Sequence, residues 1–146
     1  MNRLSASQIN KINCKIIGTE DNFNDKEEKF KNILKDIAFA PYEQDEKFFY
    51  RYRDTVSKAA KLSYDIADQK PFGKGNIKTA VFIALTLLQI NQINTKEGYQ
   101  EDLPIFEAAL RDGDFKQIED WLRNHTRDRF AMVIDEPDFQ GDLCII

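Results

Sequence analysis

Apolar residues recur every three or four positions along most of the chain, the spacing that places them on one face of an α-helix. Ile9, Ile12 and Ile16 show this spacing in the first such segment. No segment alternates between apolar and polar residues over a useful length, so strands are not predicted. The predicted helices run over about residues 5–17, 26–40, 54–70, 76–91, 104–113 and from 114 to at least 122.

Residues with known preferences at helix ends support these boundaries. Asp54 and Asp114 are suitable N-caps, Pro71 cannot comfortably follow a helical residue, and Gly113 is a natural residue just past a helix end. The helix at 76–91 is apolar on nearly every side, so we expect it to be the buried central helix. The sequence therefore predicts an all-α bundle of about six helices, with a short flap or hairpin before the third helix.

The composition fits one domain of ordinary size. The chain has 146 residues, of which 42% are hydrophobic and 12% aromatic, enough to form a core. Its formal net charge of -4 argues against nucleic-acid binding by its own surface, which requires a basic face. The longest apolar stretch, residues 81–88, is far shorter than the ~20 residues of a membrane span. Cys14 and Cys144 have neither disulfide-framework nor zinc-site spacing, so we expect a cytoplasmic protein with reduced thiols and no membrane partner.

A glycine-rich loop at residues 70–76 leads into the predicted central helix. The first turn of a helix has free backbone N–H groups and a partial positive charge. Gly73 and Gly75 allow the backbone to approach a ligand closely, and Lys74 and Lys78 add positive charge. Such a site suits a phosphate group. The same residues equally describe a plain interhelical loop with a glycine-supported turn.

The loop and its flanks resemble the Fic/Doc family. The family signature reads His-Pro-Phe-x-(Asp/Glu)-Gly-Asn-(Gly/Lys)-Arg-Thr-Ala. The residues of this chain that match it are Pro71, Phe72, Gly75, Asn76, Thr79 and Ala80. Residues 52–62, 80–91 and 108–123 are similar to helices around this loop in Doc-type (death-on-curing) toxins. The resemblance implies a Fic/Doc-like domain over residues 1–127, followed by a C-terminal extension at 128–146.

The sequence departs from the family at the positions that carry its chemistry. Lys70 occupies the place of the histidine that acts as general base, and a protonated lysine cannot accept a proton at neutral pH. Lys74 replaces the acidic residue that helps to hold magnesium, and its charge argues against Mg²⁺ binding. Lys78 replaces a phosphate-binding arginine and lacks its forked donor group. Of the four positions that carry the family's chemistry, namely 70, 74, 76 and 78, only position 76 keeps the family residue, Asn76.

Two functions follow from the resemblance. The first, which the departures favour, is a catalytically impaired protein related to toxin–antitoxin toxins, which binds or regulates an antitoxin-like or target protein. The alternative is an active transferase that moves AMP or phosphate from ATP or another nucleotide to a hydroxyl group of a translation factor. Its catalytic positions would then be Lys70, Asn76 and Lys78. The residues implied in nucleotide or anion binding are Gly73, Lys74, Gly75, Asn76 and Lys78.

An aromatic segment before the third helix has two interpretations. Phe48, Phe49 and Tyr50 correspond to the flap with which Fic proteins pair with an extended stretch of their target, a common mode of peptide binding. The same side chains would also suit a role in covering the core. The sequence favours neither interpretation.

The last part of the chain is acidic in its middle, at Asp135, Glu136, Asp138 and Asp142. It fits a loosely packed or disordered extension, a partner-binding segment, or an acidic strand folded over the lysine-rich loop. His125 is the only histidine in the chain and lies near a predicted helix end, where we expect it to be solvated. With one histidine and no acidic partner motif, no metal site is predicted.

Overall fold

The computed structural model describes residues 2–128 and is mainly helical. Its α-helices are α1 (Ala6–Ile17), α2 (Glu28–Phe39), α3 (Thr55–Gln69), α4 (Asn76–Ile90), α5 (Leu103–Asp112) and α6 (Phe115–Asn124). Short 3₁₀ turns are η1 (Phe23–Asp25), η2 (Ala40–Tyr42) and η3 (Tyr99–Asp102). The strands are β1 (Ile93–Thr95) and β2 (Thr126–Asp128). The predicted all-α class and number of helices are confirmed for the described residues.

Most helices begin and end at the residues that the sequence marks. The side chains of Ser5, Asp54 and Asp114 each accept a hydrogen bond from the first turn of α1, α3 and α6. Gly113 ends α5 in the left-handed conformation that glycine adopts without strain. Lys70 ends α3 as expected, because Pro71 disfavours a helical conformation in the residue before it.

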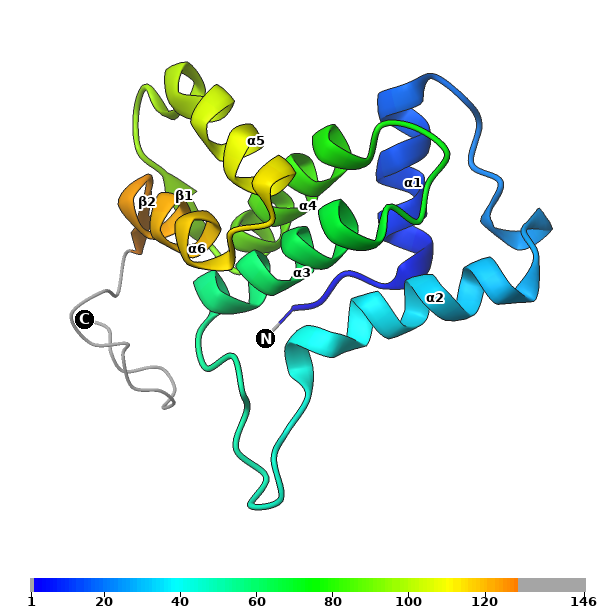
Figure 1. Ribbon diagram of the computed structural model, residues 1–146, viewed down its shortest axis with the longest axis horizontal. Helices are drawn as coiled ribbons and strands as arrows, with labels where there is room; N and C mark the ends of the chain where they lie inside the picture. Colours follow the sequence, from blue (N-terminus) through cyan, green and yellow to red (C-terminus); the bar gives the residue numbers. More distant parts are fainter. Residues whose placement is uncertain (1, 129–146) are drawn as a thin grey trace.

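Helices α3 and α4 form the centre of the molecule. They pack side by side, with α1 and α2 on one side and α5 and α6 on the other (Figure 1). The largest fully buried side chains in α3 and α4 are Leu62, Ile66, Ile83, Leu87 and Leu88. Burial of these side chains is the main source of stability for helices of this length, since isolated helices of 15 residues or fewer are marginal in water.

The expectation that α4 is buried on every side is wrong in one respect. Phe82 is 50% exposed, and Leu85 is only partly buried. Helix α4 packs against α1, α3 and α5, and the side that carries Phe82 faces solvent. An apolar residue on the surface is common in folded proteins, so the composition of a helix alone does not show how many of its sides are covered.

A small antiparallel sheet joins the two ends of the α5–α6 pair and was not predicted. Ile93 in β1 pairs with Asp128 in β2, and Thr95 pairs with Thr126. Each strand has three residues, which is too short for an alternating pattern to be seen in the sequence. The described part of the chain contains no helix long and apolar enough to cross a membrane.

The domain boundary predicted at residue 127 or 128 falls at the end of the described part, where β2 includes Asp128. The acidic residues of the predicted extension, Asp135, Glu136, Asp138 and Asp142, lie outside the described residues. The three interpretations of that segment therefore stay predictions.

Candidate functional site

The loop between α3 and α4 (residues 70–75) is held in shape by Asn76. The side-chain oxygen of Asn76 accepts a hydrogen bond from the backbone N–H of Phe72 at 3.0 Å, and its amide donates to the backbone carbonyl of Phe72 at 2.9 Å. The Phe72 ring is buried and meets the Phe30 ring edge-on at 5.9 Å. Asn76 was predicted to bind a ligand, but both ends of its side chain already serve the loop. The second side-chain N–H of Asn76 and its backbone N–H, at the start of α4, stay candidate ligand groups.

The backbone conformation of Gly75 and the close approach of α1 both favour glycine at this position. Gly75 has a φ of 79°, and a Cβ atom there would lie 2.9 Å from Cγ2 of Ile17. Asn13 of α1 reinforces this contact, because its buried amide donates to the carbonyl of Lys74 and to the hydroxyl of Thr79, both at 3.0 Å. Gly73 differs, since a Cβ atom at that position would meet nothing within 4 Å, so that side of the loop is open.

A pair of glycine substitutions tests this division of roles. Gly75→Ala is expected to lower the free energy of unfolding by about 1–3 kcal/mol, because alanine is strained at positive φ and collides with Ile17. Gly73→Ala, the matched control, is expected to leave stability unchanged or slightly raised. Urea unfolding of both variants measures the difference. Equal losses would show that the contact with α1 is not what selects glycine at position 75.

Three lysines surround the start of α4. Lys70, Lys74 and Lys78 are all exposed, and none forms an ion pair within the described part of the chain. No side chain caps the N-terminus of α4, so its first backbone N–H groups have no side-chain acceptor. The loop therefore combines positive charge with backbone donors, as the sequence predicts.

The predicted flap is a short β-hairpin (residues 43–51) that projects from the helical body (Figure 1). Gln44 and Tyr50 form its bridge, and the carboxylate of Asp45 accepts hydrogen bonds from the backbone of Lys47 and Phe49 at 2.8 and 3.0 Å. Phe48 has a φ of 66°, which is uncommon for a bulky residue. This turn therefore holds a strained phenylalanine at its tip.

The hairpin aromatics do not cover the core. Phe48 is 77% exposed, Phe49 is 56% exposed and Tyr50 is 39% exposed. One side of the hairpin and the end of α2 flank an open hollow of about 460 Å³. Its lining residues are Phe39, Glu43, Gln44, Asp45, Phe48 and Arg51. Of the two interpretations that the sequence leaves open, exposure favours the one in which these residues meet a partner.

The hairpin and the lysine-rich loop are at opposite ends of α3. The hairpin leads into the N-terminus of α3 and the loop leaves its C-terminus, and the helix has 15 residues. At about 1.5 Å per residue these two features are about 22 Å apart along the helix axis. Figure 1 shows the hairpin and the loop on opposite sides of the molecule. The predicted anion-binding loop and the predicted flap therefore lie on two separate surfaces.

The base of the hairpin is held by a buried lysine that was not predicted. Lys58 of α3 is 3% exposed, and its ammonium donates to the carbonyl of Tyr52 and lies 4.4 Å from the centroid of the Tyr50 ring. Burial lowers the pKa of Lys58, and the nearby Arg3 charge lowers it further, while Asp54 opposes both. The spacing of Lys58, Leu62 and Ile66 is the signal that places this lysine on the buried face.

His125 is also not the solvated residue that was expected. Its ring stacks on Trp121 with centroids 4.1 Å apart, and its two nitrogens lie 2.8 Å from the Trp121 carbonyl and 2.9 Å from the Asp102 carboxylate. The Trp121 indole donates to the carbonyl of Asp102 at 3.1 Å. These contacts join the end of α6 to the turn before α5, so we assign His125 a structural role.

Among the side chains of residues 2–127 no group of three or more His, Cys, Asp or Glu is placed to hold a metal ion. No protein-family model matches the chain, and no curated protein or solved structure is significantly similar to it. The functional argument therefore depends on the geometry of the two surfaces and on the residues that form them.

Proposed function

We propose that this chain is a Fic/Doc-like protein that binds a phosphate-bearing ligand at the α3–α4 loop without transferring a group from it. The proposal depends on the different roles of two groups of residues in the loop. Phe72, Gly75 and Asn76 maintain its shape, whereas the positions left for chemistry are exposed lysines. The loop keeps the residues that maintain its shape, but lysines stand in place of the family's general base and of its acidic magnesium ligand. This combination supports phosphate binding rather than catalysis.

The backbone of Gly73 and the first N–H groups of α4 would hold phosphate oxygens, because nothing covers Gly73 and no side chain caps α4. Lys74 and Lys78 would supply positive charge near the helix start. Their charges repel each other when no anion is present, so binding also stabilises the fold. ATP or another nucleotide fits this arrangement through its phosphates.

A transferase is the alternative, and the same residues argue against it. The ammonium of Lys70 has no acceptor lone pair while protonated, so it cannot take a proton from a target hydroxyl. Lys74 places a positive charge where the family positions a carboxylate for magnesium. Charge stabilisation by the lysines alone is the mechanism that would have to compensate for both losses.

The hairpin would serve a protein partner, either an antitoxin-like protein or a target. Exposed Phe48 and Phe49 are anchors of the kind that dominate protein interfaces, and the strain at Phe48 marks a residue kept for something other than local stability. Because the hairpin lies about 22 Å from the loop along α3, partner binding and phosphate binding are expected to be separable by mutation.

Titration of the full chain with inorganic phosphate, and then with ATP without magnesium, tests phosphate binding. We expect saturable shifts of the Gly73 and Lys74 amide resonances at millimolar ligand, weaker at high salt because the lysines are exposed. Lys74→Gln with Lys78→Gln should remove the shifts. Lys35→Gln, which removes an exposed lysine of α2, is the matched control and should keep them.

Two other outcomes of this titration are informative. Binding that appears only when magnesium is added would favour the transferase alternative. No shift at the loop in low salt would leave the lysines without a phosphate ligand and would contradict the proposal.

A further inference from the structure

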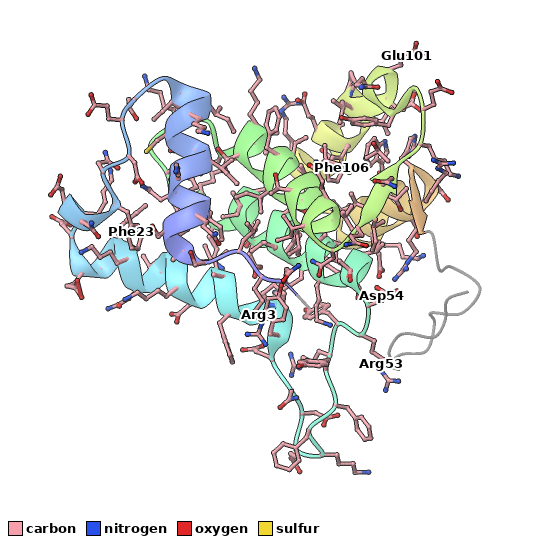
Figure 2. The ribbon with its side chains drawn as sticks, turned by 180° about the vertical axis from the view of Figure 1, so that it is seen from behind. Arg3, Phe23, Arg53, Asp54, Glu101 and Phe106 are labelled. Carbon is pink, nitrogen blue, oxygen red and sulfur yellow. The ribbon has the colours of Figure 1, made fainter. Side chains whose placement is uncertain are left out.

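A second group of cations lies at the base of the hairpin, away from the α3–α4 loop. The Arg3 guanidinium lies 4.0 Å from the centroid of the Tyr42 ring, and the Lys58 ammonium lies 6.0 Å from the same centroid. The two charges are therefore at most about 10 Å apart, the sum of those distances. Figure 2 shows Arg3 beside the helical body at the end from which the hairpin projects.

Neither of these two charges forms an ion pair with a carboxylate among the side chains that the structure describes. No acidic oxygen of residues 2–127 lies within 4.0 Å of the charged nitrogens of Arg3 or Lys58. The acidic group that acts on Lys58 is Asp54, which is already engaged. Arg123 binds its two oxygens at 2.8 and 3.2 Å, and one of them also accepts the backbone N–H of Ser57. Although burial alone would raise it, the pKa of Asp54 is lowered by these donors.

The third member of the cluster is an unused donor. Tyr42 is 4% exposed, and its hydroxyl has no hydrogen-bond partner among the described residues. Most buried polar side-chain atoms are hydrogen-bonded, since an unpaired one loses its bonds to water without replacing them. The Tyr42 ring that carries this hydroxyl is the one whose centroid lies 4.0 Å from the Arg3 guanidinium. Burial raises the pKa of Tyr42, and the charge of Arg3 opposes that rise.

We propose that Arg3, Tyr42 and Lys58 form a binding site for one oxyanion, a carboxylate or a phosphate. Arg3 supplies a forked donor from the segment before α1, Tyr42 supplies a hydroxyl from η2, and Lys58 supplies charge from α3. The anion relieves the repulsion between the two cations and satisfies the hydroxyl. This site is independent of the α3–α4 loop and does not rest on the function proposed for it.

An anion bound at this site would hold the hairpin more firmly against α3. Tyr42 precedes the first arm of the hairpin, and Lys58 holds the second arm through the Tyr52 carbonyl and the Tyr50 ring. An anion that binds both residues therefore fixes the two arms relative to α3. Binding is expected to slow hydrogen exchange of the hairpin amides.

The anion has two possible sources that share this chemistry. One is a free phosphate or carboxylate, and the other is an acidic side chain of the same chain, at Asp135, Glu136, Asp138 or Asp142. Full-length protein in which these four are changed to Asn or Gln separates the two sources without shortening the chain.

The experiment is a titration of the full chain with phosphate, and separately with acetate, at low salt. Binding is monitored through the NMR resonances of the Arg3 side-chain N–H and of the Tyr42 and Lys58 backbone amides. A saturable response of the natural chain supports a free anion as the ligand. If instead these resonances move when the four acidic residues are neutralised, and the neutralised protein then responds to phosphate, an acidic side chain occupies the site. No response in either protein overturns the proposal.

Two variants separate a binding role from a structural one. Tyr42→Phe removes only the hydroxyl and should weaken anion binding by several-fold to about tenfold while the protein stays folded. Arg3→Gln should weaken it by about tenfold or more, and Arg3→Lys should recover part of the loss. Unchanged binding in Tyr42→Phe and Arg3→Gln would overturn the site. The Gly73 amide in the same spectra reports the α3–α4 loop, so failure at one surface is distinguishable from failure at the other.

Discussion

The triple variant Lys70→His, Lys74→Asp, Lys78→Arg is expected to transfer label from ATP to protein about 10²–10⁴-fold faster than the natural chain, the usual contribution of a general base. Histidine can accept a proton at neutral pH, and it tolerates the left-handed conformation that position 70 adopts, with a φ of 47°. Aspartate supplies an oxygen ligand for magnesium, and arginine restores a forked grip on phosphate. This follows from the proposal that the loop keeps its scaffold.

The scaffold itself should tolerate these three changes. The contact of Lys74 with α1 is made by its backbone carbonyl, which accepts from Asn13, and the side chains at 70, 74 and 78 are exposed. The matched control is Lys70→Gln, Lys74→Asn, Lys78→Arg, which removes the lysine charges at 70 and 74 and keeps a cation at 78, as the triple variant does, but supplies neither a base nor a carboxylate. Incorporation of label from α- and γ-labelled ATP distinguishes transfer of AMP from transfer of phosphate. A natural chain as active as the triple variant would show that the lysines are competent catalysts.

The sequence predicts the helical part of this fold well because the signals are local. Asp54, Asp114 and Gly113 act at helix ends through bonds to residues three or four positions away, so their role is visible in the sequence. The β1–β2 sheet joins residues about thirty positions apart over only three pairs, and no local pattern announces such a contact. The exposure of one side of α4 was not predicted for a related reason, because the number of elements that pack against a helix cannot be derived from the sequence of that helix.

The candidate site was predicted in its parts but not in its arrangement. The lysines and the uncapped helix start are where the sequence places them. Gly75 and Asn76 were predicted to bind a ligand, and that prediction is untested. The structure adds roles that were not predicted, since Gly75 contacts α1 and the Asn76 side chain binds the backbone of Phe72. Glycine allows close approach by either a ligand or another helix, and an asparagine side chain can hydrogen-bond to either a ligand or the backbone. The sequence does not distinguish these uses, and only the three-dimensional contacts do.

For the buried lysine Lys58, two signals in the sequence contradict each other. Its charge suggests a surface residue, since lysine is almost never fully buried unless it is paired. Its position four residues before Leu62 suggests the core. The structure resolves the conflict with the Tyr52 carbonyl and the rings of Tyr42 and Tyr50, which surround the ammonium. All three partners lie in or beside the hairpin, whose path the sequence does not determine.

The largest expected loss of stability comes from Leu87→Ala in the middle of α4. Leu87 is fully buried between the central helices, so its removal loses apolar burial and leaves a cavity that closely packed neighbours cannot fill. We expect the free energy of unfolding to fall by about 2–5 kcal/mol, measured by urea denaturation. The slightly higher helix propensity of alanine offsets only a few tenths of a kcal/mol of this loss.

Phe82→Ala on the same helix is the matched control, and it makes the comparison decisive. The substitution removes a larger side chain than Leu87→Ala, so the greater loss would fall at position 82 if stability depended on side-chain size alone. Because Phe82 is 50% exposed, its removal gives up much less burial and opens no enclosed cavity, and we expect less than half the loss seen at Leu87. Equal losses, or a greater loss at Phe82, would mean that the outward side of α4 is covered. A second chain or residues 129–146 would then have to supply that cover, and the first test would be whether the unfolding midpoint depends on protein concentration.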